Sequence, residues 1–300
     1  MSTFPESRTL DTRAAARPAT VIRVRRFSAR VAGRVAIYAL LIALAILFLL
    51  PLFWMLTTAF KPQQLVYRFP PEWFSTDWTV ANFRTGWNAL PFARFFVNSA
   101  FVTLLTVVGT VLSSSLAGFG FARYRGRGAG VLFIVLLATM MVPPTTTLIP
   151  RFVMFAEIGW TNSYLPLILP PFFAGPFYVF LFRQFFRSVP REYFDAAEID
   201  GASPFTLYWR IALPMAKPAI AASAIFSALA AWNDFIDPLV FLTSTDKQTY
   251  QIGLSNFQGQ YYNQLHLMMP MALLGVVPIL LLVIVGQRWI ANGIAGDLEK

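Results

Sequence analysis

Three carboxylates recur at every third residue within a polar segment, residues 190–218. They are Glu192, Asp195 and Glu198, and this spacing places them on one face of a helix. Acids in the first turns of a helix also complement the positive end of its dipole. Charge gathered on one face of a short helix suits contact with a partner. We therefore expect residues 190–218, hereafter the polar segment, to be a docking element; the alternative is an ordinary amphipathic loop at the membrane interface.

A second polar group interrupts an apolar run later in the chain. It comprises Trp232, Asn233, Asp234 and Phe235, followed by Asp237. An acid inside a membrane span costs about 2.5–3.5 kcal/mol to insert, so Asp234 and Asp237 are candidates for function. Aromatic rings stack on a bound molecule and an amide forms hydrogen bonds with it, so residues 232–235 are suited to a solute pathway. Two alternatives stay open: these residues pack a subunit interface, or both acids lie at the membrane surface beside Pro238.

Residues needed for most catalytic chemistry are absent. No Gly-x-x-x-x-Gly-Lys-Ser/Thr segment occurs, so the chain lacks that route to binding ATP phosphates. The sequence has no cysteine and one histidine, His266, which excludes a His/Cys metal cluster. Serines 113–115 have no histidine partner in the same apolar run, which argues against a serine hydrolase. We predict that the chain is not an enzyme, holds no metal or cofactor, and receives energy from another subunit.

The elements that position these residues are long apolar helices. Hydrophobic side chains make up 57% of the chain and charged ones 13%, about half the charged fraction of a soluble domain. The net charge of +10 does not indicate a nucleic-acid partner, because the basic residues cluster near the N-terminus and beside apolar runs. The composition predicts an all-α membrane protein.

Six apolar runs are long enough to cross a bilayer as helices. We expect these spans at residues 35–60, 95–122, 129–150, 165–187, 219–243 and 267–287. Residues 1–34 are expected to be a mostly disordered basic tail, with a short basic helix near Arg23–Arg34 as an alternative for its last part, and residues 292–300 a short C-terminal tail. In the second span Gly109, Ser113 and Ala117 are spaced by four, which permits close approach of another helix.

The basic residues also predict the orientation of the chain. Of the 24 Lys and Arg residues, 18 lie in segments on the same side of the membrane as the N-terminus, and 6 on the other side. Positive charge marks the cytoplasmic side. We therefore expect both termini and the polar segment to be cytoplasmic.

The polar segment itself is predicted to form two short helices separated by a turn. Gly201 is suited to end the first helix, because glycine adopts the left-handed conformation without strain. Ser203 and Pro204 then provide the N-cap and the first residue of the second helix. Pro214 and Pro218 close that helix.

The polar segment resembles the cytoplasmic loop of the permease subunits of bacterial ATP-binding-cassette importers. That loop carries a Glu-Ala-Ala triplet, then a glycine, then a Leu-Pro pair. Here Asp195-Ala196-Ala197 takes the place of the triplet, with aspartate for glutamate. Gly201 takes the place of the glycine, and Leu213-Pro214 that of the pair, with Ile211 shortly before it. The run Ile199–Ser203 is typical of the carbohydrate-uptake branch, which is related to the maltose permeases.

Shorter matches extend the resemblance along nearly the whole chain, in the family's order. They are Phe60–Pro62, Asn98-Ser99, Ala122-Arg123, Met140–Pro143, Trp232–Phe235 and Pro238-Leu239. Residues 1–34 match least well, since they are longer than the family needs.

The resemblance implies the type I importer permease fold in a bacterial inner membrane. Six transmembrane helices would form a permease domain over residues 35–291, with a cytoplasmic coupling helix between the fourth and fifth. It implies three kinds of partner: a second, related permease chain, a homodimeric ATPase that binds ATP and Mg²⁺, and an extracytoplasmic solute-binding protein. Contact with the ATPase is implied for the positions that match the family's loop. These are Glu192, Asp195, Ala196, Ala197, Gly201, Leu213 and Pro214.

The rival function is a secondary transporter driven by an ion gradient. Such a protein needs ionisable relays within the membrane and usually an internal repeat. Four of the six predicted spans carry no charge, and the two halves of the chain do not resemble each other. The sequence therefore favours an importer, and the family's branch implies a carbohydrate, polyol or sugar phosphate as the solute.

Overall fold

The computed structural model describes residues 19–124, 126–259 and 264–295, and the elements that these residues form are all helices. The chain divides into two compact units, Met1–Trp54 and Met55–Lys300. The described part of the first unit lies within α1 (Ala19–Ala59), whose large apolar side chains between Val35 and Leu50 are exposed. The prediction of an all-α protein is confirmed.

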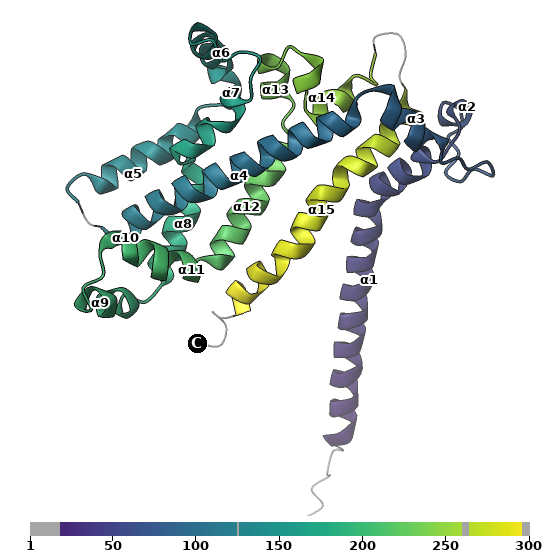
Figure 1. The fold of residues 1–300 in the computed structure, drawn as a ribbon. Coiled ribbons are helices and arrows are strands. Elements are labelled where there is room, and N and C mark those ends of the chain that lie inside the picture. Colours follow the sequence, from purple (N-terminus) through teal and green to yellow (C-terminus); the bar gives the residue numbers. More distant parts are fainter. Residues whose placement is uncertain (1–18, 125, 260–263, 296–300) are drawn as a thin grey trace, which may run out of the picture. The chain divides into compact units, whose positions relative to one another are not determined.

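The second unit contains the remaining helices, joined mostly by short turns (Figure 1). In chain order they are α2 (Gln63–Val66), α3 (Ala81–Ala89), α4 (Phe92–Arg123), α5 (Ala129–Ala138), η1 (Thr139–Met141), η2 (Pro144–Thr147), α6 (Leu148–Glu157), α7 (Leu165–Ile168), η3 (Pro170–Phe173), α8 (Pro176–Ser188), α9 (Glu192–Ile199), α10 (Pro204–Thr206), η4 (Leu207–Ala212), α11 (Leu213–Met215), α12 (Lys217–Trp232), α13 (Ile236–Phe241), η5 (Thr245–Lys247), α14 (Tyr250–Ser255) and α15 (Leu265–Ala295). The η4 segment is a π-helical turn, and the other η segments are 3₁₀ turns.

Length and composition make several helical stretches able to cross a membrane. Four qualify by themselves: Gly33–Ala59, Phe92–Arg123, Leu165–Ser188 and Leu265–Trp289. Two further pairs are bent, by 91° between Met141 and Pro144 and by 77° between Met215 and Lys217. The described residues thus provide four spans, or up to six if each bent pair crosses once. Prolines lie at both bends, where their missing amide hydrogens interrupt the helical bonds.

Helix α4 is the element on which the second unit packs, and it contacts α8, α12 and η3 (Figure 1). Close approach is possible because the contact positions are small. A Cβ at Gly109 would overlap the ring of Phe172. The hydroxyl of Ser113 donates to the carbonyl of Pro171 at 3.0 Å. The predicted role of Gly109 and Ser113 in helix packing is therefore confirmed.

A closer approach that the sequence analysis missed occurs at Gly118. A Cβ there would lie 2.6 Å from the Cβ of Phe182 and 2.9 Å from the backbone nitrogen of Arg183. Neither atom can be moved by a change of rotamer alone, so the backbones of α4 and α8 would have to separate. Gly118 thus fixes the distance between these two helices.

The buried side chains form three clusters along α4. The first joins its C-terminal end to α8, α9 and η4 through Phe119, Phe182, Phe194 and Tyr208. The second joins its N-terminal end to α12, α14 and α15 through Phe92, Phe95, Trp232, Tyr250 and Met271. The third joins Val102 to α6, α7 and α13 through Phe155, Leu167 and Phe241. Each end of α4 therefore has its own core.

Polar contacts hold the N-terminal end of α4. The Nδ2 atom of Asn98 donates to the carbonyls of Asp246 and Gln248, at 2.9 and 2.8 Å. The hydroxyl of Ser99 accepts from the backbone amide of Tyr250 at 2.8 Å. The Asn98-Ser99 pair therefore attaches α4 to η5 and α14.

A single added methyl group tests the close contact between α4 and α8. Gly118→Ala should destabilise the fold by about 1–3 kcal/mol, because the backbones must separate. Thermal unfolding of the purified protein in detergent measures this change. The matched control is Gly120→Ala on the same helix, where a Cβ meets no atom within 4 Å. Equal stability of the two variants would contradict the packing described for Gly118.

Candidate functional site

The first helix of the polar segment, α9, ends in the turn that the sequence predicts. Gly201 adopts the left-handed conformation, with φ of 83°. Its amide donates to the carbonyl of Glu198 at 3.0 Å, and the amide of Ala202 donates to that of Ala197 at 2.9 Å. These two bonds form a Schellman motif. Gly201 therefore fixes the direction in which the chain leaves α9.

The second helix begins at a capped serine, also as predicted. The hydroxyl of Ser203 accepts from the amide of Thr206 at 3.3 Å, and Pro204 is the first helical residue. The helix continues through the π turn η4 and α11, and it bends into α12 at Ala216, between Pro214 and Pro218. The π turn was not predicted; such turns are frequent at functional sites.

An arginine on α4 holds α9 in place. The Nη2 atom of Arg123 lies 2.6 Å from Oδ1 of Asp195 and 3.0 Å from Oε1 of Glu198. The guanidinium carbon of Arg123 lies 5.1 Å from the centre of the Phe194 ring. One exposed ion pair contributes little, but an arginine shared by two carboxylates and an aromatic ring forms a network. Two of the three acids predicted to share a face therefore bind one partner.

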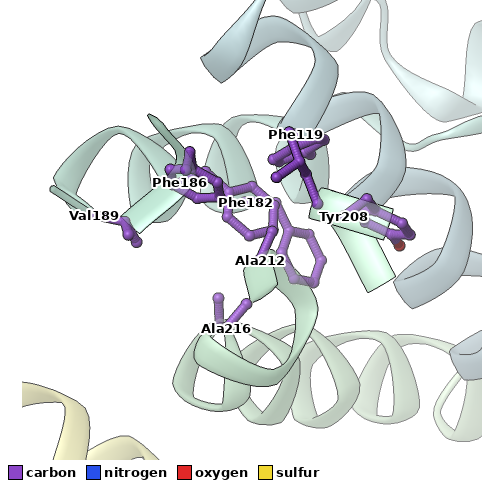
Figure 2. Close-up of a cluster of buried hydrophobic side chains, with 10 residues drawn as sticks. Phe119, Phe182, Phe186, Val189, Tyr208, Ala212 and Ala216 are labelled. Atoms are coloured by element: carbon purple, nitrogen blue, oxygen red, sulfur yellow. The ribbon is translucent and has the colours of Figure 1, made fainter. Parts of the chain in front are cut away.

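A buried cluster joins the polar segment to α4 and α8 (Figure 2). The ring of Phe119 on α4 lies 5.6 Å from that of Tyr208 on η4 and 6.0 Å from that of Phe194 on α9. A buried hydrogen bond of 2.7 Å joins the hydroxyls of Tyr208 and Ser115. Both halves of the polar segment are thus packed on α4.

The polar segment also exposes large apolar side chains. Ile199, Phe205 and Tyr193 are 87%, 66% and 56% exposed, and the exposed ring of Trp209 lies 5.9 Å from that of Phe205. Exposed apolar groups beside charged ones are typical of a surface that contacts another protein. The sequence analysis did not single out these four side chains.

The remaining predicted residues of the polar segment have different surroundings. Glu192 and Ala196 are exposed on α9, and Pro214 is exposed within α11. Ala197 and Leu213 pack against the buried cluster. All seven predicted residues therefore lie in one helical hairpin, where some face outward and others pack inward.

The second group of predicted residues lies at a break in the chain. The predicted span 219–243 contains two helices, α12 and α13, separated by residues 233–235. Trp232 is buried, and its Nε1 atom donates to the carbonyl of Gly275 on α15 at 2.9 Å. Asn233 is exposed and accepts from Nε2 of Gln251 at 3.2 Å. Phe235 is half-buried.

Asp234 belongs to a charged cluster at this break. Its Oδ1 atom accepts from the backbone amide of Asp237 at 3.3 Å. Arg151 donates through both terminal nitrogens to the two carboxylate oxygens of Asp237, each at 2.8 Å. Arg151 was not predicted as a site residue, because it lies 86 residues before Asp237 in the chain and is its neighbour only in the folded structure.

The same three residues, Arg151, Asp234 and Asp237, line two cavities. One, of about 460 Å³, is also lined by Tyr178 and extends between α4, α8 and α12. The other, of about 600 Å³, adjoins η2 and α6. Both volumes fall in the range that holds small molecules. Carboxylate and guanidinium groups in such a wall can bind the hydroxyl groups of a polar solute.

Among the residues that the structure describes, no three His, Cys, Asp or Glu side chains come together in a way that could hold a metal ion.

Known proteins resemble this chain over most of its length. A probable ABC transporter permease, YurM of Bacillus subtilis, is 30% identical over 270 residues, which cover 89% of each chain. The arabinooligosaccharides transport system permease AraQ of the same organism is 31% identical over 267 residues, 87% of this chain and 94% of AraQ. A chain from the crystal structure of a bacterial ABC transporter involved in the import of the acidic polysaccharide alginate matches the fold. Its TM-score is 0.75 at 21% sequence identity, over 87% of this chain and 97% of that one.

A family model describes the same relationship. Residues 109–294 match the model of the binding-protein-dependent transport system inner membrane component. This region contains the polar segment and the cluster of Arg151, Asp234 and Asp237. The chain belongs to the family of inner membrane components of binding-protein-dependent transport systems.

Proposed function

We propose that this chain is the permease subunit of a carbohydrate importer and that it couples to a separate ATPase through the polar segment. The observation that carries the proposal is the exposed helix α9, held on α4 by the ion pairs of Arg123 with Asp195 and Glu198. Membership of the family supports the transport role. The names of the relatives AraQ and the alginate transporter support a carbohydrate or a related polyol or sugar phosphate as the solute.

The proposed coupling runs along two helices. Closure of the ATPase dimer on ATP would displace α9 and the adjoining η4. Because both pack on the C-terminal end of α4, and α11 continues into α12, the displacement would pass to both helices. The other end of α12 leads to Asp234 and the cavities that it lines. ATP would thus shift the pore between two states that open to opposite sides.

The proposed assembly contains four kinds of component. Two permease chains, this one and a related partner, form the pore, and a homodimeric ATPase supplies the sites for ATP and Mg²⁺. A solute-binding protein delivers the solute from outside the inner membrane. The excess of basic residues on one side supports placing both termini and the polar segment in the cytoplasm. Within this proposal residues 35–291 form the permease domain. The expectation of tails at 1–34 and 292–300 was too long, because residues 19–34 belong to α1 and residues 292–295 to α15; residues 1–18 and 296–300 lie outside the described residues.

Gly201→Asp tests the coupling role of the polar segment. The variant should insert normally but lower ATP-driven uptake by at least about tenfold, because the turn after α9 changes while the pore does not. Uptake is measured in proteoliposomes with the ATPase and the binding protein added. Wild-type uptake should require both the ATPase and ATP.

The control for this variant is Gly159→Asp. Gly159 also has a left-handed backbone, with φ of 73°, and like Gly201 has no atom near a built Cβ. The two substitutions therefore carry similar backbone strain, and only one lies in the polar segment. Normal uptake by Gly201→Asp, or uptake driven by a proton or sodium gradient without ATPase, would overturn the proposal.

Asp234→Asn tests whether the charged cluster contacts the solute. The asparagine side chain keeps the shape of aspartate and an oxygen that accepts from the backbone amide of Asp237, but it carries no charge. The KM for uptake should therefore rise about tenfold. Maximal ATPase activity should change little. Asp246→Asn, at an exposed acid in η5, serves as the control. An unchanged KM in Asp234→Asn would assign Asp234 a structural role.

A further inference from the structure

A basic cavity lies beside the polar segment, at the ends of four helices. It has a volume of about 370 Å³ and is formed by the C-terminal ends of α4 and α8, the N-terminal turn of α5 and the start of α9. Four arginines line it: Arg123, Arg183, Arg187 and Arg191. Its other lining residues are mainly aromatic or small. The cavity is separate from those lined by Asp234.

Three of these arginines form no ion pair with an acid of the described chain. Arg123 is held by Asp195 and Glu198. Among the residues that the structure describes, no carboxylate lies within ion-pair distance of Arg183, Arg187 or Arg191. Like charges gathered in one cavity repel each other, and an anion between them would relieve that repulsion.

The wall of the cavity holds the guanidinium of Arg183 in place. The guanidinium carbon of Arg183 lies 4.0 Å from the centre of the Phe133 ring, and its Nε atom lies 3.4 Å from the carbonyl of Phe121. The rings of Phe121 and Phe133 are themselves 5.4 Å apart. Stacking on an aromatic face orients a guanidinium while leaving its edge donors available. Arg183 is therefore oriented before any ligand enters.

The surroundings of the cavity favour an anion that carries apolar chains. Helix α5 begins at the cavity, and its side chains Val131, Leu132 and Ile134 are exposed. Its N-terminal turn contains no acidic residue, which leaves the positive end of the helix dipole at the cavity. A ligand with an anionic headgroup in the cavity and hydrocarbon chains along α5 would match both the positive end of the helix and its exposed apolar side chains.

We infer that this cavity binds the phosphate group of an anionic phospholipid, whose acyl chains lie against α5. Arginine-lined pockets between membrane helices suit such headgroups. A phosphate in contact with Arg187 and Arg191 would connect α8 with the segment that leads into α9. Anionic lipid would then stabilise the position of the polar segment on the bundle.

The test measures phosphatidylglycerol bound to the importer complex that contains the full chain. The complex is placed in phosphatidylcholine nanodiscs with rising fractions of phosphatidylglycerol, and retained lipid is counted by native mass spectrometry. We expect one saturable site per chain. Arg187→Gln/Arg191→Gln should raise the fraction of phosphatidylglycerol at half-saturation about thirtyfold, because two arginines near the headgroup are lost. Both side chains are exposed, so folding should be unaffected.

Two further variants distinguish lipid binding at this cavity from a general effect of positive charge on the protein. Arg187→Lys/Arg191→Lys keeps the charge and should stay within about fivefold of the wild type. Arg84→Gln/Arg94→Gln removes the same charge from exposed positions on α3 and α4 and should bind as the wild type does.

Three results would overturn the inference. One is phosphatidylglycerol binding that does not saturate, or that is equal in the wild type and Arg187→Gln/Arg191→Gln. A second is tight binding of inorganic phosphate in pure phosphatidylcholine nanodiscs, lost in the same variant, which would identify a free anion as the ligand. The third is loss of the ATPase from that variant in nanodiscs without phosphatidylglycerol, which would identify a protein partner.

Discussion

The close contact of α4 with α8 at Gly118 is the constraint on which the rest of the second unit depends. Helices in lipid gain little from the hydrophobic effect when they associate, so small residues that allow backbone contact are decisive. With the two helices held at this distance, Phe119 lies against Phe186, at 5.6 Å, and Arg123 reaches α9. The position of the polar segment therefore depends on glycine at position 118.

Helix α4 connects regions that the proposed mechanism assigns to different tasks. Asn98 and Ser99 attach one end to η5 and α14, and Arg123 attaches the other end to α9. In between, Ser113 binds η3. These attachments along one continuous helix are the physical basis for proposing that a force at the polar segment reaches the cavities.

Features that depend on a few neighbouring residues could be predicted from the sequence. Gly201 ends α9, and Ser203 with Pro204 begins the next helix, because φ preferences and caps act within one turn. The all-helical class followed from composition. The ion pairs of Arg123 could not be predicted, since they join residues 72 and 75 positions apart. Local patterns also gave no sign that Trp232 is buried against α15 or that Arg151 would reach Asp237.

Contact between α9 and the ATPase is the central claim, and cross-linking measures it most directly. The sequence has no cysteine, so Ile199→Cys, at a side chain that is 87% exposed, introduces a single thiol for a photoactivated maleimide reagent. Phe74→Cys, at a 73% exposed position between α2 and α3, provides the comparison. After assembly with the ATPase and illumination, Ile199→Cys should give an adduct of the two proteins and Phe74→Cys should give none. An ATPase adduct from Phe74→Cys, or its absence from Ile199→Cys in an assembled complex, would contradict the account.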